Sequence, residues 1–260
     1  MQIRTRLGIG FGLLLLLYGL TSWFIVGAVQ SAYRQTLESH ASLFASQTRT
    51  RIENSILYDR DQIIMLSRMP QVLNAAMGNG DAAQLTDWLE EEILQYQELQ
   101  YGSPLYSDIA LHGRDGELLL STSGRESRPP ESERWWERAL SGGYSLSPVA
   151  RDGDNDAAFI RVAAAIYGEK GNILGVLTAD IDFLVVVRSN EVSARPFDST
   201  VLTVISGDGS LLYRSIPFVP LASVAEQSFF QRMDSGDGVF TSSDGASPRL
   251  YAYTTDRKST

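Results

Sequence analysis

Side chains that commonly carry catalysis are scarce in this sequence. The only two histidines, His40 and His112, lie far apart and form no HxxxH or HxH spacing that would hold a metal ion. The sequence has no cysteine, which excludes thiolate nucleophiles, disulfides and cysteine-ligated zinc. It also has no GxSxG nucleophile elbow and no convincing Ser/His/Asp set or carboxylate pair. We therefore predict that the chain is no enzyme and needs no cofactor or metal.

Charged residues at apolar positions indicate ligand binding or ion pairing instead. Asp180 lies in the otherwise apolar segment 173–181, which has the composition of a buried strand. Because a buried carboxylate is costly unless it is paired, Asp180 is expected either to contact a ligand or to form a salt bridge with a nearby arginine. Asp182 would share its face of the strand, so the sequence leaves open which acid matters.

Composition limits what the surrounding protein can be. The chain has 260 residues, of which 43% are hydrophobic, and this is enough apolar material for a folded protein with a substantial core. Its net charge is -9 and its basic residues are scattered, so the positive patch that nucleic acid requires is missing. Nucleic acid is therefore not an expected partner.

The amino-terminal segment predicts a membrane anchor. Residues 7–29 carry no charge, and a helix of that length crosses a hydrocarbon core of roughly 30 Å. Arg4 and Arg6 precede it, while no Lys or Arg follows before Arg34, which places residues 1–6 in the cytoplasm. The rest is then expected outside a bacterial inner membrane, in the periplasm or extracellular space. A cleaved signal peptide is the alternative, but the apolar run exceeds the roughly 7 to 15 residues typical of such peptides.

Residues 30–69 are predicted to continue this helix as a stalk. Apolar or small residues recur three or four positions apart from Tyr33 to Leu66, and no Gly or Pro interrupts them before Pro70. Such a helix would be about 60 Å long. Its apolar stripe is expected to pack both on the following domains and on a second copy of the chain, so we predict a homodimer through the transmembrane and stalk helices.

The remaining sequence indicates helices followed by antiparallel strands. Residues 71–100 have a helical pattern that is broken near Gly78, and a hairpin with an Asp115-Gly116 turn follows Tyr106. The later elements are predicted as a helix over 133–140 and strands over 157–167, 173–181, 201–205, 210–214, 238–242 and 249–254.

An internal repeat predicts two similar modules. The hairpin sequence of residues 109–121 returns at residues 202–214, where Asp208-Gly209 matches Asp115-Gly116. We therefore expect an α+β fold with two tandem modules, over residues 70–190 and 191–260. The second module is expected to be truncated, because the sequence ends before its last strand.

Two stretches resemble a known family. Residues 133–143, ERWWERALSGG, and 159–186, FIRVAAAIYGEKGNILGVLTADIDFLVV, are similar in order and spacing to the membrane-distal pocket and closing strand of double Cache sensor domains. These domains occur in bacterial chemoreceptors, sensor histidine kinases and diguanylate cyclases, and the resemblance covers nearly all of residues 30–260. It implies PAS-like modules, a small-molecule site in the distal module, and a cytoplasmic effector that would lie outside this fragment.

The resemblance also implies particular ligand-binding residues. Trp135 and Trp136 stand where the family has its aromatic pocket wall, and Asp180 matches the acid that meets the ammonium group of an amino-acid ligand. Core packing is the alternative for the tryptophans, since adjacent helical residues cannot both face one way.

The sequence departs from the amino-acid-binding pattern at two places. The family's arginine two residues before the tryptophan is Glu133 here, with Arg134 displaced by one, and residues 148–151 read Pro-Val-Ala-Arg where the family has Pro-Tyr-x-Asp. With Arg134, Arg151 and Arg161 around the implied site, an anionic ligand such as a carboxylate is expected, because guanidinium groups bind carboxylates in bidentate fashion.

The predicted function is that of an extracytoplasmic sensing domain of a membrane-bound signal-transduction receptor. Its ligand would be an amino acid, an organic acid or an amine. A membrane-anchored exported hydrolase and a periplasmic scaffold that binds no small molecule are the two rival interpretations.

Overall fold

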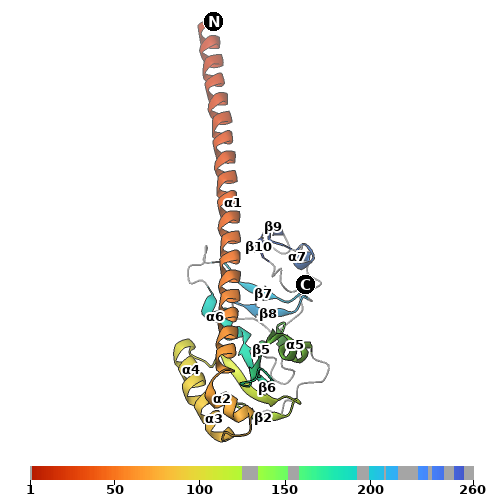
Figure 1. Ribbon diagram of the computed structural model, residues 1–260. Helices are drawn as coiled ribbons and strands as arrows, with labels where there is room; N and C mark the ends of the chain where they lie inside the picture. The colour runs from red at the N-terminus through yellow and green to blue at the C-terminus, as the bar shows by residue number, and fades with distance from the viewer. Residues whose placement is uncertain are drawn as a thin grey trace.

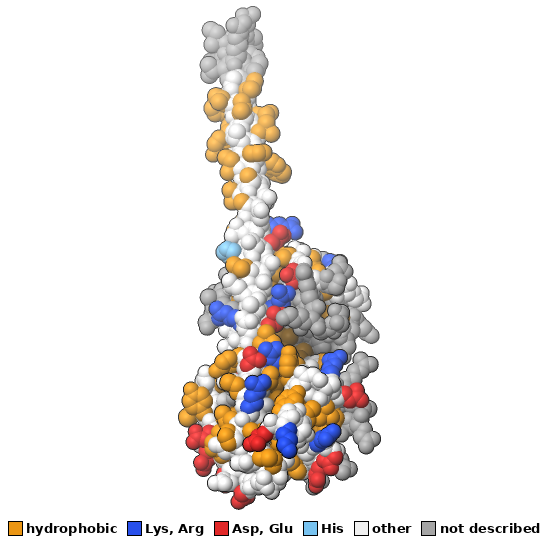
Figure 2. Space-filling view, viewed as in Figure 1, with side chains coloured by type: hydrophobic (Ala, Val, Ile, Leu, Met, Phe, Trp, Pro, Cys, Tyr) orange, Lys and Arg blue, Asp and Glu red, His pale blue; other side chains and the backbone are white. Residues whose placement is uncertain are grey.

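The computed structural model describes residues 2–124, 134–151, 158–191, 199–207, 209–215, 228–233, 236–242 and 249–254. Helix α1, Gln2–Leu66, runs without interruption and rises as a rod out of the folded part of the chain (Figure 1). Apolar side chains of its outer half are exposed, with Trp23 at 83% and Phe24 at 77%, and they appear as the orange side chains along the rod in Figure 2. By length and composition α1 is able to cross a membrane, although a signal sequence would pass the same test.

The stalk helix ends close to its predicted limit at residue 69. α1 stops at Leu66, and Met69 has extended backbone angles, φ -70° and ψ 142°. Pro70 explains this end, because a proline disfavours the helical conformation of the residue before it and is itself suited to the first turn of the next helix.

The predicted helical segment forms a small layer of short helices. These are α2, Pro70–Ala76; α3, Ala82–Leu89; the π-helical turn η1, Glu90–Leu94; and α4, Gln95–Tyr101. Gly78 interrupts the layer as predicted, with a φ of 73° that a side chain would strain. Asp81 caps α3, because its Oδ1 accepts a hydrogen bond of 3.0 Å from the Ala83 N–H.

An antiparallel sheet lies beside these helices. Its strands are β1, Tyr106–Gly113; β2, Leu118–Ser121; β3, Tyr144–Leu146; β4, Ala150–Arg151; β5, Ala158–Tyr167; and β6, Ile173–Asp182. The strand order is β2-β1-β6-β5-β3, and β4 also pairs with β5. Helix α5, Arg134–Gly142, connects the β1–β2 hairpin to the rest of the sheet in sequence.

The main core lies between one face of this sheet and the helices α1, α2 and α3. Its buried side chains come from alternate positions of the strands, as expected for a sheet covered by helices on that face. They include Ile63, Leu66, Val72, Leu89, Ile109, Leu111, Val162, Leu177, Ala179 and Ile181.

Helix α6, Phe183–Asn190, was not predicted. Its sequence is rich in valine, a β-branched residue that favours strands, and this concealed the helix. Asp182 initiates it, because its Oδ1 accepts hydrogen bonds from the N–H groups of Leu184 and Val185 at 2.8 and 3.2 Å. An acid before an apolar run was the available signal.

The repeated hairpin has the same geometry in both copies. The second copy consists of β7, Thr203–Ile205, and β8, Leu211–Arg214, and both copies carry one bulge, with Leu111 opposite Leu120 in the first and Val204 opposite Tyr213 in the second. The two turn glycines, Gly116 and Gly209, have φ values of 83° and 84°.

The ends of the two hairpins are also closed in the same way. The Ile109 N–H donates to Thr122 Oγ1 at 2.9 Å, and at the equivalent position the Leu202 N–H donates to Ser215 Oγ at 3.0 Å. The described residues therefore confirm that the hairpin occurs twice with the same geometry, although Asp208 lies outside them.

The remaining described elements belong to the carboxyl-terminal part. They are α7, Ser228–Gln231; β9, Gly238–Ser242; and β10, Arg249–Tyr253, and they lie beside the rod in Figure 1. β9 pairs with β10 in a two-stranded sheet, as β7 does with β8. Arg49 of α1 reaches this part through Thr254, whose Oγ1 accepts a hydrogen bond of 2.6 Å from Nη1.

One glycine of the sheet allows no side chain. A Cβ at Gly175 in β6 would overlap the backbone carbonyl oxygen of His112 in β1, so Gly175→Ala must push the two central strands apart. We expect a loss of about 1–3 kcal/mol in the free energy of unfolding, measured by urea denaturation of the full chain in detergent. Gly142→Ala is the control, because a Cβ there meets nothing within 4 Å. Equal effects of both substitutions would contradict the close approach of the strands.

Candidate ligand-binding site

The second face of the sheet differs from the core face because it carries polar groups. Asp108, Asp180 and Arg161 are opposite one another on β1, β6 and β5, and they form one row across the three strands. His112 lies farther along β1, and Ser145 lies on β3 opposite Ala163. Helix α5 covers this face, with Trp135 and Ala139 packed on Ala163 and Val176.

Arg161 and Asp180 form a bidentate ion pair at the centre of this face. Arg161 Nε donates to Asp180 Oδ1 at 2.6 Å, and Nη2 donates to Oδ2 at 2.7 Å. The two side chains are 20% and 12% exposed, so the pair is largely removed from water. Of the two roles that the sequence left open for Asp180, the structure therefore contains the salt bridge.

Two aromatic rings lie against the Arg161 guanidinium. Its carbon atom lies 5.2 Å from the ring centre of Trp135 and 5.4 Å from that of Phe159. Both distances fall within the range of cation–π attraction. Trp135 thus contacts the ion pair directly.

The two tryptophans have different environments, as expected for neighbours on a helix. Trp135 is buried at 9% exposure, whereas Trp136 is partly exposed and packs edge-on against Trp135 and against His112, with 5.8 Å between ring centres in each pair. The structure therefore brings Trp135, Trp136, Arg161 and Asp180 together. Arg134 and Arg151 begin α5 and end β4, but their side chains lie outside the described residues.

Three buried polar atoms of this face have no hydrogen-bond partner among the described residues. They are Trp135 Nε1, Ser145 Oγ and His112 Nδ1. Buried polar groups are nearly always hydrogen-bonded, so such a group needs an explanation, and a bound molecule is one. Sequence reasoning missed Ser145 and found no metal-binding spacing at His112, because neither residue lies in a motif and only strand pairing places both on this face.

The imidazole of His112 is uncharged at neutral pH. Burial and, to a smaller extent, the nearby Arg161 charge together lower the pKa of His112 from 6.5 to about 4, while Asp108 acts in the opposite direction. His112 therefore offers a neutral ring nitrogen and no charge.

The two acids near Asp180 have structural hydrogen bonds. Asp108 Oδ1 accepts from Ser121 Oγ at 2.8 Å and from the Ser123 N–H at 3.0 Å, which fixes the end of β2. Asp182, which the sequence could not separate from Asp180, caps α6. Of these three acids, Asp180 is the one that is paired with an arginine on the α5 face.

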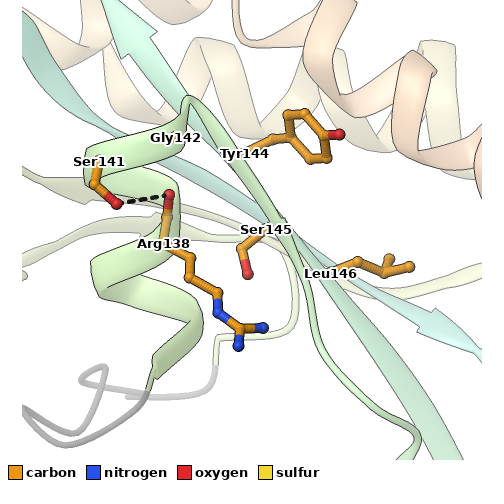
Figure 3. A pocket seen from close by; sticks show the side chains of 6 residues that line it. All are labelled: Arg138, Ser141, Gly142, Tyr144, Ser145 and Leu146. Carbon is orange, nitrogen blue, oxygen red and sulfur yellow. Dashed lines mark hydrogen bonds between the residues drawn. The ribbon is translucent and has the colours of Figure 1, made fainter. Parts of the chain in front are cut away.

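A hollow adjoins the cluster at Ser145. It is an open groove of about 390 Å³ between the end of α5 and the start of β3 (Figure 3). Figure 3 shows Arg138 and Ser145 on one side of β3, and Tyr144 and Leu146 directed away from them. The groove is lined by Arg138, Ser141, Gly142, Tyr144, Ser145 and Leu146.

Several solved structures with a similar arrangement of elements are sensor or ligand-binding domains of bacterial receptors. The sensory domain of the Campylobacter jejuni chemoreceptor Tlp3 (CcmL) is 17% identical, with 85% of this chain and 89% of that chain covered and a TM-score of 0.54. The ligand-binding domain of Tlp3 in complex with 4-methylisoleucine is 15% identical, with coverages of 83% and 85% and a TM-score of 0.53. The sensor domain of the V. cholerae histidine kinase DctB is 16% identical, with coverages of 70% and 68% and a TM-score of 0.51.

No protein-family model matches the sequence, and no curated protein matches it. The structural similarity therefore identifies the fold, which is that of the ligand-binding domains of chemoreceptors and of a histidine kinase. It confirms the predicted α+β class with a long amino-terminal helix and antiparallel sheets, and the predicted resemblance to double Cache domains at the level of the fold.

Proposed function

We propose that this chain is the membrane-anchored, extracytoplasmic sensing part of a bacterial signal-transduction receptor, and that it binds a small molecule between α5 and the sheet. The observation that carries the proposal is the set of buried polar atoms on that face that have no hydrogen-bond partner in the described part of the chain, Trp135 Nε1, Ser145 Oγ and His112 Nδ1. A buried polar group without a partner costs about 1–3 kcal/mol, and a ligand that supplies the partners removes that cost.

The fold supports this proposal. In structures with the same fold the corresponding domains are sensors, and Tlp3 holds 4-methylisoleucine. We assign residues 70–190 to the ligand-binding module and residues 191–260 to a membrane-proximal module. Residues 7–29 would cross the inner membrane with the amino terminus in the cytoplasm, and the cytoplasmic effector would be that of a chemoreceptor, a histidine kinase or a diguanylate cyclase.

The stalk helix is suited to carry a signal inward. Arg60 of α1 lies over the ring of Tyr144, with 5.2 Å between its guanidinium carbon and the ring centre, and Tyr144 is the immediate neighbour of Ser145 on β3. Because α1 also contacts the carboxyl-terminal part through Arg49, a shift of β3 on ligand binding would move the rod relative to both parts. In a homodimer that is formed through the two α1 helices, that shift would change the relative position of the two cytoplasmic effectors.

Thermal unfolding of the full chain in detergent, with amino acids, organic acids and amines added singly, tests the proposal. One compound class should give a saturable rise in Tm, because a ligand that binds only the folded state stabilises it by RT ln(1 + [L]/Kd). Trp135→Phe keeps the aromatic ring and removes the N–H, so it should weaken the apparent affinity about threefold to tenfold.

Trp88→Phe is the matched control, because Trp88 lies in α3 and packs on the core face of the sheet. It should leave the affinity unchanged. The proposal fails if no compound raises Tm, or if both tryptophan substitutions weaken binding equally.

A further inference from the structure

Arg161 already pairs with the Asp180 carboxylate, the group with which a positively charged ligand would have to pair. Asp180 receives one hydrogen bond on each oxygen, at 2.6 and 2.7 Å, and both come from the same guanidinium. Planar two-point pairing of this kind is the geometry in which arginine and carboxylate fit best. An ammonium group that approached Asp180 would have to displace this pair.

Displacement of Arg161 is opposed by its surroundings. The backbone pairing of β5 and β6 puts Arg161 directly opposite Asp180, so the two side chains leave the sheet side by side. The rings of Trp135 and Phe159 lie against the guanidinium at 5.2 and 5.4 Å, and both contacts would be lost if the side chain swung away. Arg161 is therefore held where a cationic ligand group would otherwise bind.

We propose that Arg161 is the specificity-determining residue of this site: its guanidinium occupies Asp180 and thereby excludes ligands that carry an ammonium group. This inference rests on the proposed function and narrows its ligand class. The ligand would be an uncharged or anionic molecule whose oxygen atoms accept hydrogen bonds, such as a hydroxy acid, and the amino acids and amines among the candidate ligands would be rejected.

The polar atoms of the site that find no partner within the described segments fit such a ligand. Trp135 Nε1–H can only donate, so its partner must be an acceptor. Ser145 Oγ can donate to the same kind of group, and the buried imidazole of His112, whose pKa is lowered to about 4, brings no charge of its own. The charges of Arg161 and Asp180 neutralise each other, and Asp108 in the same row accepts hydrogen bonds from Ser121 Oγ and the Ser123 N–H.

Isothermal titration of the full chain in detergent with matched compounds tests the inference. Each set contains an amino acid, the 2-hydroxy acid in which a hydroxyl replaces the amine, and the amine without the carboxylate. Suitable sets are alanine, lactate and ethylamine, and leucine, 2-hydroxy-4-methylpentanoate and 3-methylbutylamine, with an aromatic and an acidic set beside them. The wild-type protein should bind one hydroxy acid at least tenfold more tightly than its amino acid, and should bind no amine.

Arg161→Gln should reverse this preference. It frees the Asp180 carboxylate, so the amino acid or the amine of the same set should now bind at least tenfold more tightly than the hydroxy acid. The double variant Arg161→Gln/Asp180→Asn has no free carboxylate and should not gain affinity for amines, which ties the gain to Asp180. Circular dichroism checks that each variant is folded.

Tighter binding of the amino acid by the wild-type protein would overturn the inference and leave the proposed function intact. The same holds for an Arg161→Gln protein that is folded and still prefers the hydroxy acid. If neither protein binds any compound of any set, the proposed function itself is wrong. If Arg161→Gln does not fold, the inference is tested by the wild-type protein alone, through its preference between the hydroxy acid and the amino acid.

Discussion

Asp59→Asn should stabilise the protein at pH 8 by up to about 4 kcal/mol, which is an unusually large gain for one substitution. Asp59 lies on α1 and is only 2% exposed, and burial raises the pKa of its carboxyl from 3.8 to about 7. Its Oδ2 has no hydrogen-bond partner among the described residues, so nothing in them offsets the cost of burying the charged carboxylate.

The sign of the pH dependence follows from the raised pKa. Well below pH 3.8, Asp59 is protonated both in the folded protein and in the unfolded chain, and its contribution to stability is fully present. As the pH rises from about 4 to about 7, the unfolded chain loses this proton first, so the folded state loses relative stability. Above pH 7 the folded state has lost all of this stability. Asp59→Asn avoids the loss, because its amide is neutral at every pH.

Urea denaturation of the full chain in detergent between pH 4 and pH 8 measures this effect. The advantage of Asp59→Asn over the wild-type protein should grow with pH across this range and be small at its acidic end. Asp87→Asn is the control, because Asp87 is exposed on α3, and it should show no such trend. A constant difference between Asp59→Asn and wild type at all pH values would show that Asp59 does not titrate as its burial implies.

Single substitutions in the Arg161–Asp180 pair should be strongly destabilising, whereas the double substitution should not. Asp180→Asn or Arg161→Gln leaves a poorly solvated charge without its partner, and each should cost about 2–4 kcal/mol. In Arg161→Gln/Asp180→Asn neither charge is left. The loss in free energy of unfolding should therefore be smaller than the sum of the two single losses by about 2 kcal/mol or more.

A double-mutant cycle by urea denaturation at pH 7 gives this coupling energy. A matched cycle on Arg34 and Glu38 serves as the control, because that pair is 2.9 Å apart but lies on the exposed stalk, with side chains 70% and 36% exposed. Its coupling should be below about 1 kcal/mol. Additive costs at Arg161 and Asp180 would mean that the ion pair is not formed in solution.

The elements that sequence reasoning placed well are those with strong local signals. The absence of Gly and Pro between residues 30 and 69 predicted an uninterrupted stalk, and α1 runs through that segment to Leu66. The repeated Asp-Gly turn predicted the duplicated hairpin, because such turns need the positive φ that Gly116 and Gly209 adopt. Both features depend only on residues that are close together in sequence.

The pairing of Arg161 with Asp180 could not be predicted, because it depends on one irregularity. The turn between β5 and β6 was located correctly, but the register shifts between Ile166 and Tyr167. Counted back from Tyr167 opposite Ile173, a regular hairpin would put Ala179 opposite Arg161, and the carboxylate of Asp180 would be on the other face. A bulge of one residue thus brings the two charges opposite each other. The residue types in the turn do not predict this bulge.

The indole N–H resonance of Trp135 tests the central claim most directly, since that claim is a small molecule bound between α5 and the polar face of the sheet. In ¹⁵N-tryptophan-labelled full chain, the Trp135 signal is assigned by its loss in Trp135→Phe, and a stabilising compound is then titrated in. We predict a saturable shift of the Trp135 signal at the concentrations that raise Tm, with the Trp88 signal in place. A compound that binds and moves the Trp88 signal while the Trp135 signal stays still would contradict the site.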